Sequence, residues 1–252
     1  MRGSGARTSA DPERRPRYGV ERQAVRTRFL WYPAVACVTL LAFGCVTPMA
    51  LDRNELNRLK DEPSIAVVYY RAPDFIVAIP EASSLFGGGY IYMATAKSAG
   101  ERMIRKYELQ DPTLRVRDSL ISALAAELNV KGFEVAPEPL ENDNLDTISA
   151  RFPKRLVLDF KADLWTLQPS VALSDQRRLI YGVRARLLRT EDGTLVSRAY
   201  CTYYARPMPE GWDDLTANGG ALLKARLEEA AEACAARLRL QMLTGDKETL
   251  VK

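Results

Sequence analysis

The amino-acid sequence is 252 residues long and contains no histidine and only four cysteines. Without histidine, neither a Ser-His-Asp triad nor a Cys-His pair can form, and no metal can be bound through imidazole. Cys37 and Cys45 lie near the start, which leaves Cys201 and Cys234 for the rest of the chain. Two cysteines are too few for a closed structural zinc site. The composition therefore argues against common catalytic and metal-binding arrangements, and neither a cofactor nor a metal is expected.

The glycine patterns of nucleotide-binding loops are also lacking. The triple glycine at residues 87–89 fits neither G-x-x-x-x-G-K-[ST] nor G-x-G-x-x-G, and no clear helix signal follows it. Because glycine permits positive φ, a loop or wide hairpin turn is predicted here, leading to a strand at Tyr90–Thr95. Its flanks are more apolar than a loop requires, so contact with a membrane or a partner is a functional hypothesis. The residues of this glycine loop are Leu85, Phe86, Gly87, Gly88, Gly89 and Tyr90.

One uncharged apolar run lies near the start of the chain. Phe29–Gly44 is sixteen residues long, which suits a signal peptide and falls short of the roughly 20 residues that a spanning helix needs. The run ends in LAFGC, which resembles the lipobox of bacterial lipoproteins. The resemblance implies cleavage before Cys45 and diacylglyceryl attachment to its sulfur. An ordinary signal peptide, a short uncleaved anchor and the start of a soluble cytosolic protein are the alternatives.

Charge is nearly balanced outside this leader. The whole chain has a formal net charge of +4. Eight arginines and three acidic residues precede Cys45, so the remainder holds 28 basic and 29 acidic side chains. Because this remainder has no excess of positive charge to attract phosphates, no nucleic-acid partner is expected. The predicted organisation is a basic leader and signal peptide over 1–44, a lipidated start and polar tether over 45–62, one domain over 63–245 and a frayed tail over 246–252.

Apolar residues recur in the rest of the sequence with two spacings, one typical of strands and one typical of helices. Alternating or apolar runs predict strands at Ser64–Tyr70, Phe133–Ala136 and Arg155–Leu167. In the third strand, Asp159, Lys161 and Asp163 are predicted to face solvent. Helical spacing predicts main helices at Thr113–Asn129 and Thr216–Leu243, and shorter ones at Asn54–Lys60, Ser98–Tyr107 and Asn144–Arg151. The expected fold class is α+β, a mostly antiparallel sheet with the two main helices packed on one face.

The clearest local motif is a hairpin over Leu179–Tyr204. Its turn, EDG at 191–193, is a strong hairpin signal. Cys201 falls on the apolar side of the second strand, and Cys234 falls on the apolar side of the helix that follows. In an exported protein such a pair is predicted to form a disulfide, with two buried free thiols as the alternative.

Several stretches resemble an uncharacterised family of bacterial envelope lipoproteins. They are the lipobox-like segment at Cys45, YELQDP before a helix, LLRTEDGTLVSRAYC in the hairpin and EEAAEACAARL in the last helix. The resemblance brings no catalytic motif, and it implies a lipid-anchored protein that faces the periplasm. Val46 after Cys45, in place of aspartate, favours sorting to the outer membrane.

The expected function is non-catalytic. A membrane-held protein of this kind would bind an envelope protein, a cell-wall partner such as peptidoglycan, or a lipid, or assist envelope assembly. It would do so through its exposed sheet face or the glycine loop. A histidine-free enzyme that uses carboxylates such as Asp213 and Asp214 is one alternative. An accessory subunit of a transport or secretion system is the other. A deep pocket that converges on buried carboxylates would favour the enzyme, whereas an open surface with scattered acids would favour binding.

Overall fold

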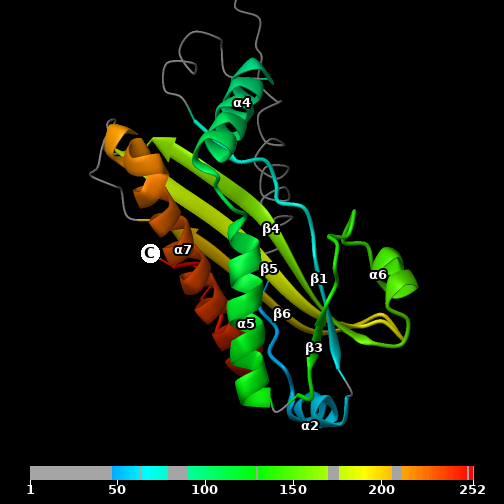
Figure 1. Cartoon of the computed structure of the whole chain (residues 1–252). Coiled ribbons are helices and arrows are strands. Elements are labelled where there is room, and N and C mark those ends of the chain that lie inside the picture. The colour runs from blue at the N-terminus through cyan, green and yellow to red at the C-terminus, as the bar shows by residue number, and fades with distance from the viewer. Residues whose placement is uncertain are drawn as a thin grey trace, which may run out of the picture. The chain divides into compact units, whose positions relative to one another are not determined.

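The computed structural model describes residues 47–62, 64–78, 90–128, 130–169, 176–205, 212–248 and 250–251 (Figure 1). The unit from Thr47 to Lys252 is compact and has its own core. The leader, Cys45 and the glycine loop up to Gly89 lie outside the described residues. The signal peptide, the lipid on Cys45 and the loop contact therefore stay predictions.

One sheet forms the centre of this unit. Its strands are β1 Ile65–Tyr69, β2 Ile76–Val77, β3 Phe133–Val135, β4 Leu156–Pro169, β5 Arg177–Arg189, β6 Thr194–Tyr204 and β7 Leu250–Val251. They follow the order β3-β1-β4-β5-β6-β7, and β2 also pairs with β4. The long strands β4, β5 and β6 are antiparallel neighbours, whereas the short strands join in parallel. By paired length the sheet is mostly antiparallel, as predicted, but the parallel additions are not foreseen by the sequence.

Strand β1 is buried on both of its faces. Ile65 and Val67 belong to the main core, and Ala66 and Val68 belong to a smaller core on the opposite face, so all four are buried. A strand that is covered on both faces reads as a continuous apolar run, which is usual for parallel pairing.

Helices cover both faces of the sheet. The described helices are α2 Arg53–Asp61, α4 Tyr90–Tyr107, α5 Pro112–Leu128, α6 Leu145–Arg151 and α7 Trp212–Thr244. Helices α5 and α7 lie side by side across one face (Figure 1). Their apolar stripes join the strand side chains in the main core, which confirms the predicted packing of the two main helices. Ile148 of α6 packs with Val157 and Leu188 in the smaller core behind.

The segment after the glycine loop is a helix, so the predicted strand at Tyr90–Thr95 is wrong. Helix α4 begins at Tyr90, well before the expected start at Ser98. The tyrosines and isoleucine of this segment favour strands locally, which is why the sequence predicts a strand. Contacts with the rest of the fold outweigh such a local preference. Helix α4 packs against β2, and Gly100 lets it approach so closely that an added Cβ would lie 1.6 Å from the carbonyl oxygen of Phe75.

The expected tether is folded from its third residue onward. Residues Thr47–Leu51, which we name the strap, run along the outer edge of β6, where Met49 pairs with Arg198 in antiparallel fashion. Leu51 is buried in the main core. Asp52 then caps α2 by accepting a hydrogen bond from Glu55 N at 2.8 Å. At the other end of the chain β7 pairs with the same edge of β6, so the expected frayed tail includes a strand.

Helix α7 contains a break near its start. Asn218, Gly219 and Gly220 all have positive φ, between 50° and 73°. Glycine adopts such angles without strain. At Gly220, an added Cβ would lie 3.0 Å from the side chain of Tyr107. The long helical run therefore starts after Gly220.

Candidate functional site

The disulfide between Cys201 and Cys234 is present. It joins β6 to α7 with a Cα–Cα distance of 5.4 Å. Both cysteines are buried in the main core, each on the side that the sequence pattern predicted. The bond fixes α7 on the sheet, and α7 forms one wall of a groove.

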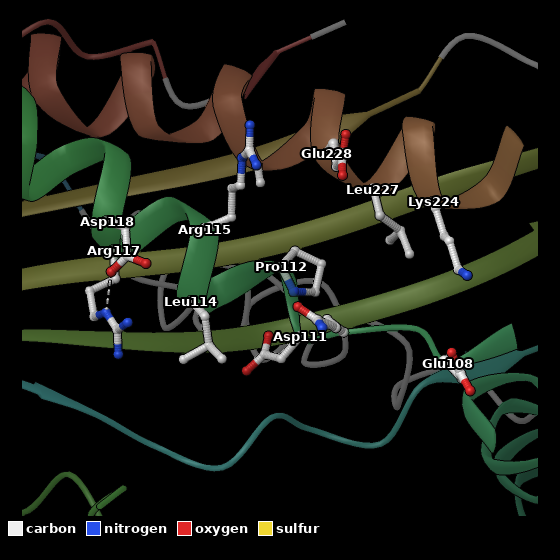
Figure 2. Close-up of a pocket in the computed structure, with 12 residues that line it drawn as sticks. Glu108, Asp111, Pro112, Leu114, Arg115, Arg117, Asp118, Lys224, Leu227 and Glu228 are labelled. Atoms are coloured by element: carbon white, nitrogen blue, oxygen red, sulfur yellow. Dashed lines mark hydrogen bonds and ion pairs between the residues drawn. The ribbon is translucent and has the colours of Figure 1, made fainter. Parts of the chain in front are cut away.

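A groove with a volume of about 640 Å³ lies between α5 and α7. Figure 2 shows Lys224 and Leu227 extending from α7, with Pro112 and Arg115 on α5. Charged side chains outnumber apolar ones along its walls. The lining residues are Glu108, Gln110, Asp111, Pro112, Leu114, Arg115, Arg117, Asp118, Lys224, Leu227, Glu228 and Ala231.

The wall on the α5 side is fixed by the way this helix begins. Asp111 Oδ1 accepts a hydrogen bond from Thr113 N at 2.8 Å and so caps the helix. Pro112 occupies the first helical position, where its missing N–H is not needed. The hydroxyl groups of Thr113 and Tyr181 lie 3.0 Å apart in the core, which ties α5 to β5. Burial raises the pKa of Asp111, and the hydrogen bonds from Thr113 offset part of that effect.

The arginines of the groove already have partners. Arg115 Nε pairs with Glu232 Oε1 of α7 at 2.7 Å, and Ser119 donates to the same carboxylate. Arg117 Nε pairs with Asp118 at 2.7 Å, a contact drawn as a dashed line in Figure 2. These are paired charges on an open wall. They do not converge on one point in the way that an acid–base catalyst and its partner would.

Buried charges lie instead on the other face of the sheet. Asp159 of β4 has 0% side-chain exposure. Arg186, directly opposite on β5, donates to its carboxylate from Nε at 3.0 and 3.1 Å and also pairs through Nη2. Tyr70 Oη donates to Asp159 at 3.0 Å, and burial followed by the charge of Asp159 raises the pKa of Tyr70. The prediction that Asp159 faces solvent is therefore wrong.

The loop before α6 covers this part of the sheet face. Asp143 of that loop accepts a hydrogen bond from Lys161 Nζ at 3.0 Å and pairs with Arg184. Arg186 Nη2 donates to the carbonyl oxygen of Asp143 at 3.0 Å. Burial by itself would raise the pKa of Asp143, but the hydrogen bond from Lys161 and the charge of Arg184 bring it below its ordinary value. The alternating pattern along β4 could not show that a loop from another part of the chain covers Asp159.

This charge network, in which Asp159 is fully buried, has three acidic and three basic side chains and is therefore suited to holding the fold. A proton-transfer catalyst needs a group that changes its protonation near neutral pH. In contrast, the lowered pKa of Asp143 keeps it ionised and the raised pKa of Tyr70 keeps it neutral. The charged members are Asp143, Asp159, Asp163, Lys161, Arg184 and Arg186. The sequence held a partial signal for it, because charged residues alternate on both strands; in the sheet Arg186 lies opposite Asp159, and Arg184 lies opposite Lys161.

The acidic residues singled out in the sequence differ in their surroundings. Asp213 and Asp214 lie exposed in the first turn of α7, and neither lines the groove. Asp159 is buried, whereas the side chain of Asp163 is 48% exposed. Within the described ranges, no three His, Cys, Asp or Glu side chains come together in a way that could hold a metal ion. Among the described helices, none combines the length and apolar character that crossing a membrane requires.

No protein-family model and no curated protein matches this chain. Among solved structures, the PelC dodecamer from Paraburkholderia phytofirmans is 14% identical, with a TM-score of 0.27 over 77% of this chain and 95% of that one. Protein XCC0632 from Xanthomonas campestris is 14% identical, with a TM-score of 0.33 over 68% and 79% of the two chains. Lipoprotein GNA1162 from Neisseria meningitidis is 13% identical, with a TM-score of 0.26 over 67% and 97%. Likenesses of this size carry no argument about function, so the site is interpreted from its own geometry.

Proposed function

We propose that this protein is a non-catalytic binding module of the cell envelope, held at a membrane by lipid on Cys45. One observation carries the proposal: the groove between α5 and α7 is open and lined by scattered charges. The fully buried carboxylate, Asp159, lies on the opposite face of the sheet and is engaged by Arg186. An enzyme would instead be expected to gather free titratable groups in a pocket.

The groove suits a polar partner such as an envelope protein or a cell-wall polymer. Lys224 and Glu228 on α7 can form ion pairs and hydrogen bonds, and Leu114 and Leu227 offer small apolar contacts between them. Such a mixture is typical of non-obligate interfaces, whose overall polarity is close to that of the remaining surface. The Cys201–Cys234 bond agrees with a protein that folds in an oxidising compartment.

Photo-crosslinking in native membranes tests the groove. The photoreactive amino acid p-benzoylphenylalanine would replace Leu114 in the groove and, as a matched control, the half-exposed Leu145 of α6. We expect a discrete adduct from position 114 and none from position 145, with the charge reversal Lys224→Glu reducing the first several-fold. Equal adducts from both positions, or none from position 114, would exclude the groove as the binding surface.

The anchor is tested separately. Replacing Cys45 with serine should abolish incorporation of labelled fatty acid and release the protein from the membrane fraction. Unchanged attachment of the Cys45→Ser variant would rule out the lipid anchor. The same variant distinguishes a lipoprotein from a protein held by an uncleaved apolar segment, because only the lipoprotein depends on this thiol.

A further inference from the structure

The strap is held on β6 by several contacts. Met49 and Arg198 exchange backbone hydrogen bonds of 2.8 and 3.0 Å. Ser197 Oγ donates to the carbonyl oxygen of Met49 at 2.8 Å. Arg198 Nη2 reaches further back and donates to the carbonyl oxygen of Thr47 at 2.9 Å. Leu51 N donates to the carbonyl oxygen of Met242 at 2.8 Å, which ties the strap to α7 as well.

Very little chain separates this fixed segment from Cys45. Only Val46 lies between Cys45 and Thr47. Because an extended residue spans at most about 3.6 Å, the Cα atoms of Cys45 and Thr47 can be no more than about 7 Å apart. An acylated Cys45 would therefore hold the β6 edge at the bilayer surface, with no slack for the domain to swing away.

The side chains around this point suit a headgroup layer. Met49 is 37% exposed, although it is a large apolar residue. The guanidinium of Arg198 lies 5.9 Å from the ring centre of Tyr200, and both side chains are partly exposed. Tyrosine and arginine are enriched where proteins meet the headgroup region, because each has an apolar body and a polar end.

We propose that the patch formed by Met49, Arg198 and Tyr200 rests against the phospholipid headgroups of the leaflet that carries the anchor. The inference rests on the proposed acylation of Cys45, and it adds how the folded domain is oriented on the membrane. Arg198 and Tyr200 lie opposite Arg186 and Arg184 in the sheet register, on the face away from α5 and α7. The groove therefore faces away from the patch, and a partner can reach it while the patch contacts lipid.

Lipid photo-crosslinking tests this orientation in the mature lipidated protein. We would place p-benzoylphenylalanine at Tyr200 and, as a control, at the exposed Ala125 of α5. Both proteins would be reconstituted in vesicles that contain a phospholipid with a clickable headgroup. We expect at least a fivefold higher lipid adduct at position 200. Equal adducts at the two positions would overturn the proposal.

A spacer variant tests the orientation of the domain separately from its attachment to the membrane. Inserting 20 Gly/Ser residues between Val46 and Thr47 gives a flexible link of about 25 Å root-mean-square length. We expect membrane attachment to persist while the adduct at position 200 falls to the level of the Ala125 control. An undiminished adduct would show that the patch does not depend on the short link. Missing acyl label on Cys45 would overturn both this proposal and the anchor, whereas label with equal adducts would overturn this one alone.

Discussion

Asp159 is buried because protein groups take the place of its water. Arg186 and Tyr70 supply hydrogen bonds to its carboxylate. Leaving a buried ion without its partner is far more unfavourable than the pair itself is favourable. The stability of this region therefore depends on the network staying complete.

We expect Asp159→Ala to lower the free energy of unfolding by about 3–5 kcal/mol, because the largely buried Arg186 would lose the carboxylate that it binds most closely. Urea unfolding followed by circular dichroism measures the change. The control is Asp163→Ala, since this carboxylate is half-exposed and 3.8 Å from Arg184, and it should change stability by about 0.5 kcal/mol or less. Similar losses in the two variants would contradict a special role for Asp159.

The environment of Asp143 should make the stability of the fold depend on pH in the acid range. Its pKa is lowered in the folded protein, so the folded state holds it ionised to a lower pH than the unfolded chain does. Its contribution to stability is complete above the unfolded value of about 4 and is lost as pH falls through the folded pKa. The difference in unfolding free energy between the wild type and Asp143→Asn should therefore shrink between about pH 5 and pH 2. A difference that does not vary with pH would contradict the lowered pKa.

The outer edge of β6 is closed by three separate elements. The strap covers one end of the edge and β7 covers the other. Between them, Gln241 of α7 accepts a hydrogen bond from Tyr200 N at 2.7 Å and donates one to the carbonyl oxygen of Glu248 at 2.6 Å. A single buried amide thus satisfies a strand N–H that would otherwise be exposed to pairing with another chain.

Gln241→Leu should lower the free energy of unfolding by about 1–3 kcal/mol, because it leaves the partly buried N–H of Tyr200 without its partner. Calorimetry should show the loss. The exposed Gln110→Leu is the matched control and should stay within about 0.5 kcal/mol of the wild type. Equal melting temperatures for the two variants would mean that water replaces the amide at this edge.

Sequence periodicity and turn residues predicted several elements closely. Helix α5 and the hairpin of β5 and β6 match their expected ranges within a few residues. The start of α4 was missed because its tyrosines favour strands locally, while its contact with β2 is non-local. The strap was missed because five residues carry no periodic pattern, and only its partner on β6 defines it as structure.

The site was predictable to a smaller extent. The cysteine pair could be assigned from export and from the apolar sides on which both residues fall. The groove could not, because its two walls meet only when α5 and α7 pack together. Asp159 was predicted on the wrong side of the burial boundary, because the loop that covers it lies elsewhere in the sequence. That loop, which contains Asp143, contacts the sheet through charged side chains and so has no apolar pattern.

At the scale of the whole molecule, the disulfide connects the sheet to its covering helix. The two cysteines are 33 residues apart, so the chain-entropy model gives about 3–4 kcal/mol of stabilisation. We expect the double variant Cys201→Ala/Cys234→Ala to unfold at correspondingly lower denaturant concentration. Reductant should lower the wild type toward the variant and leave the variant unchanged. A wild type that is indifferent to reductant would contradict a stabilising bond.

The position of the strap also has a consequence for the order of folding. Thr47 binds Arg198, which follows 151 residues later in the chain. During synthesis the N-terminal part emerges first, so the strap has no binding place until β6 and α7 have been made. Contacts with such long sequence separation form slowly, because the entropy of closing the loop must be overcome first. The strap is therefore expected to dock last although it is made early, and a chain truncated before α7 would leave the strap without its binding place.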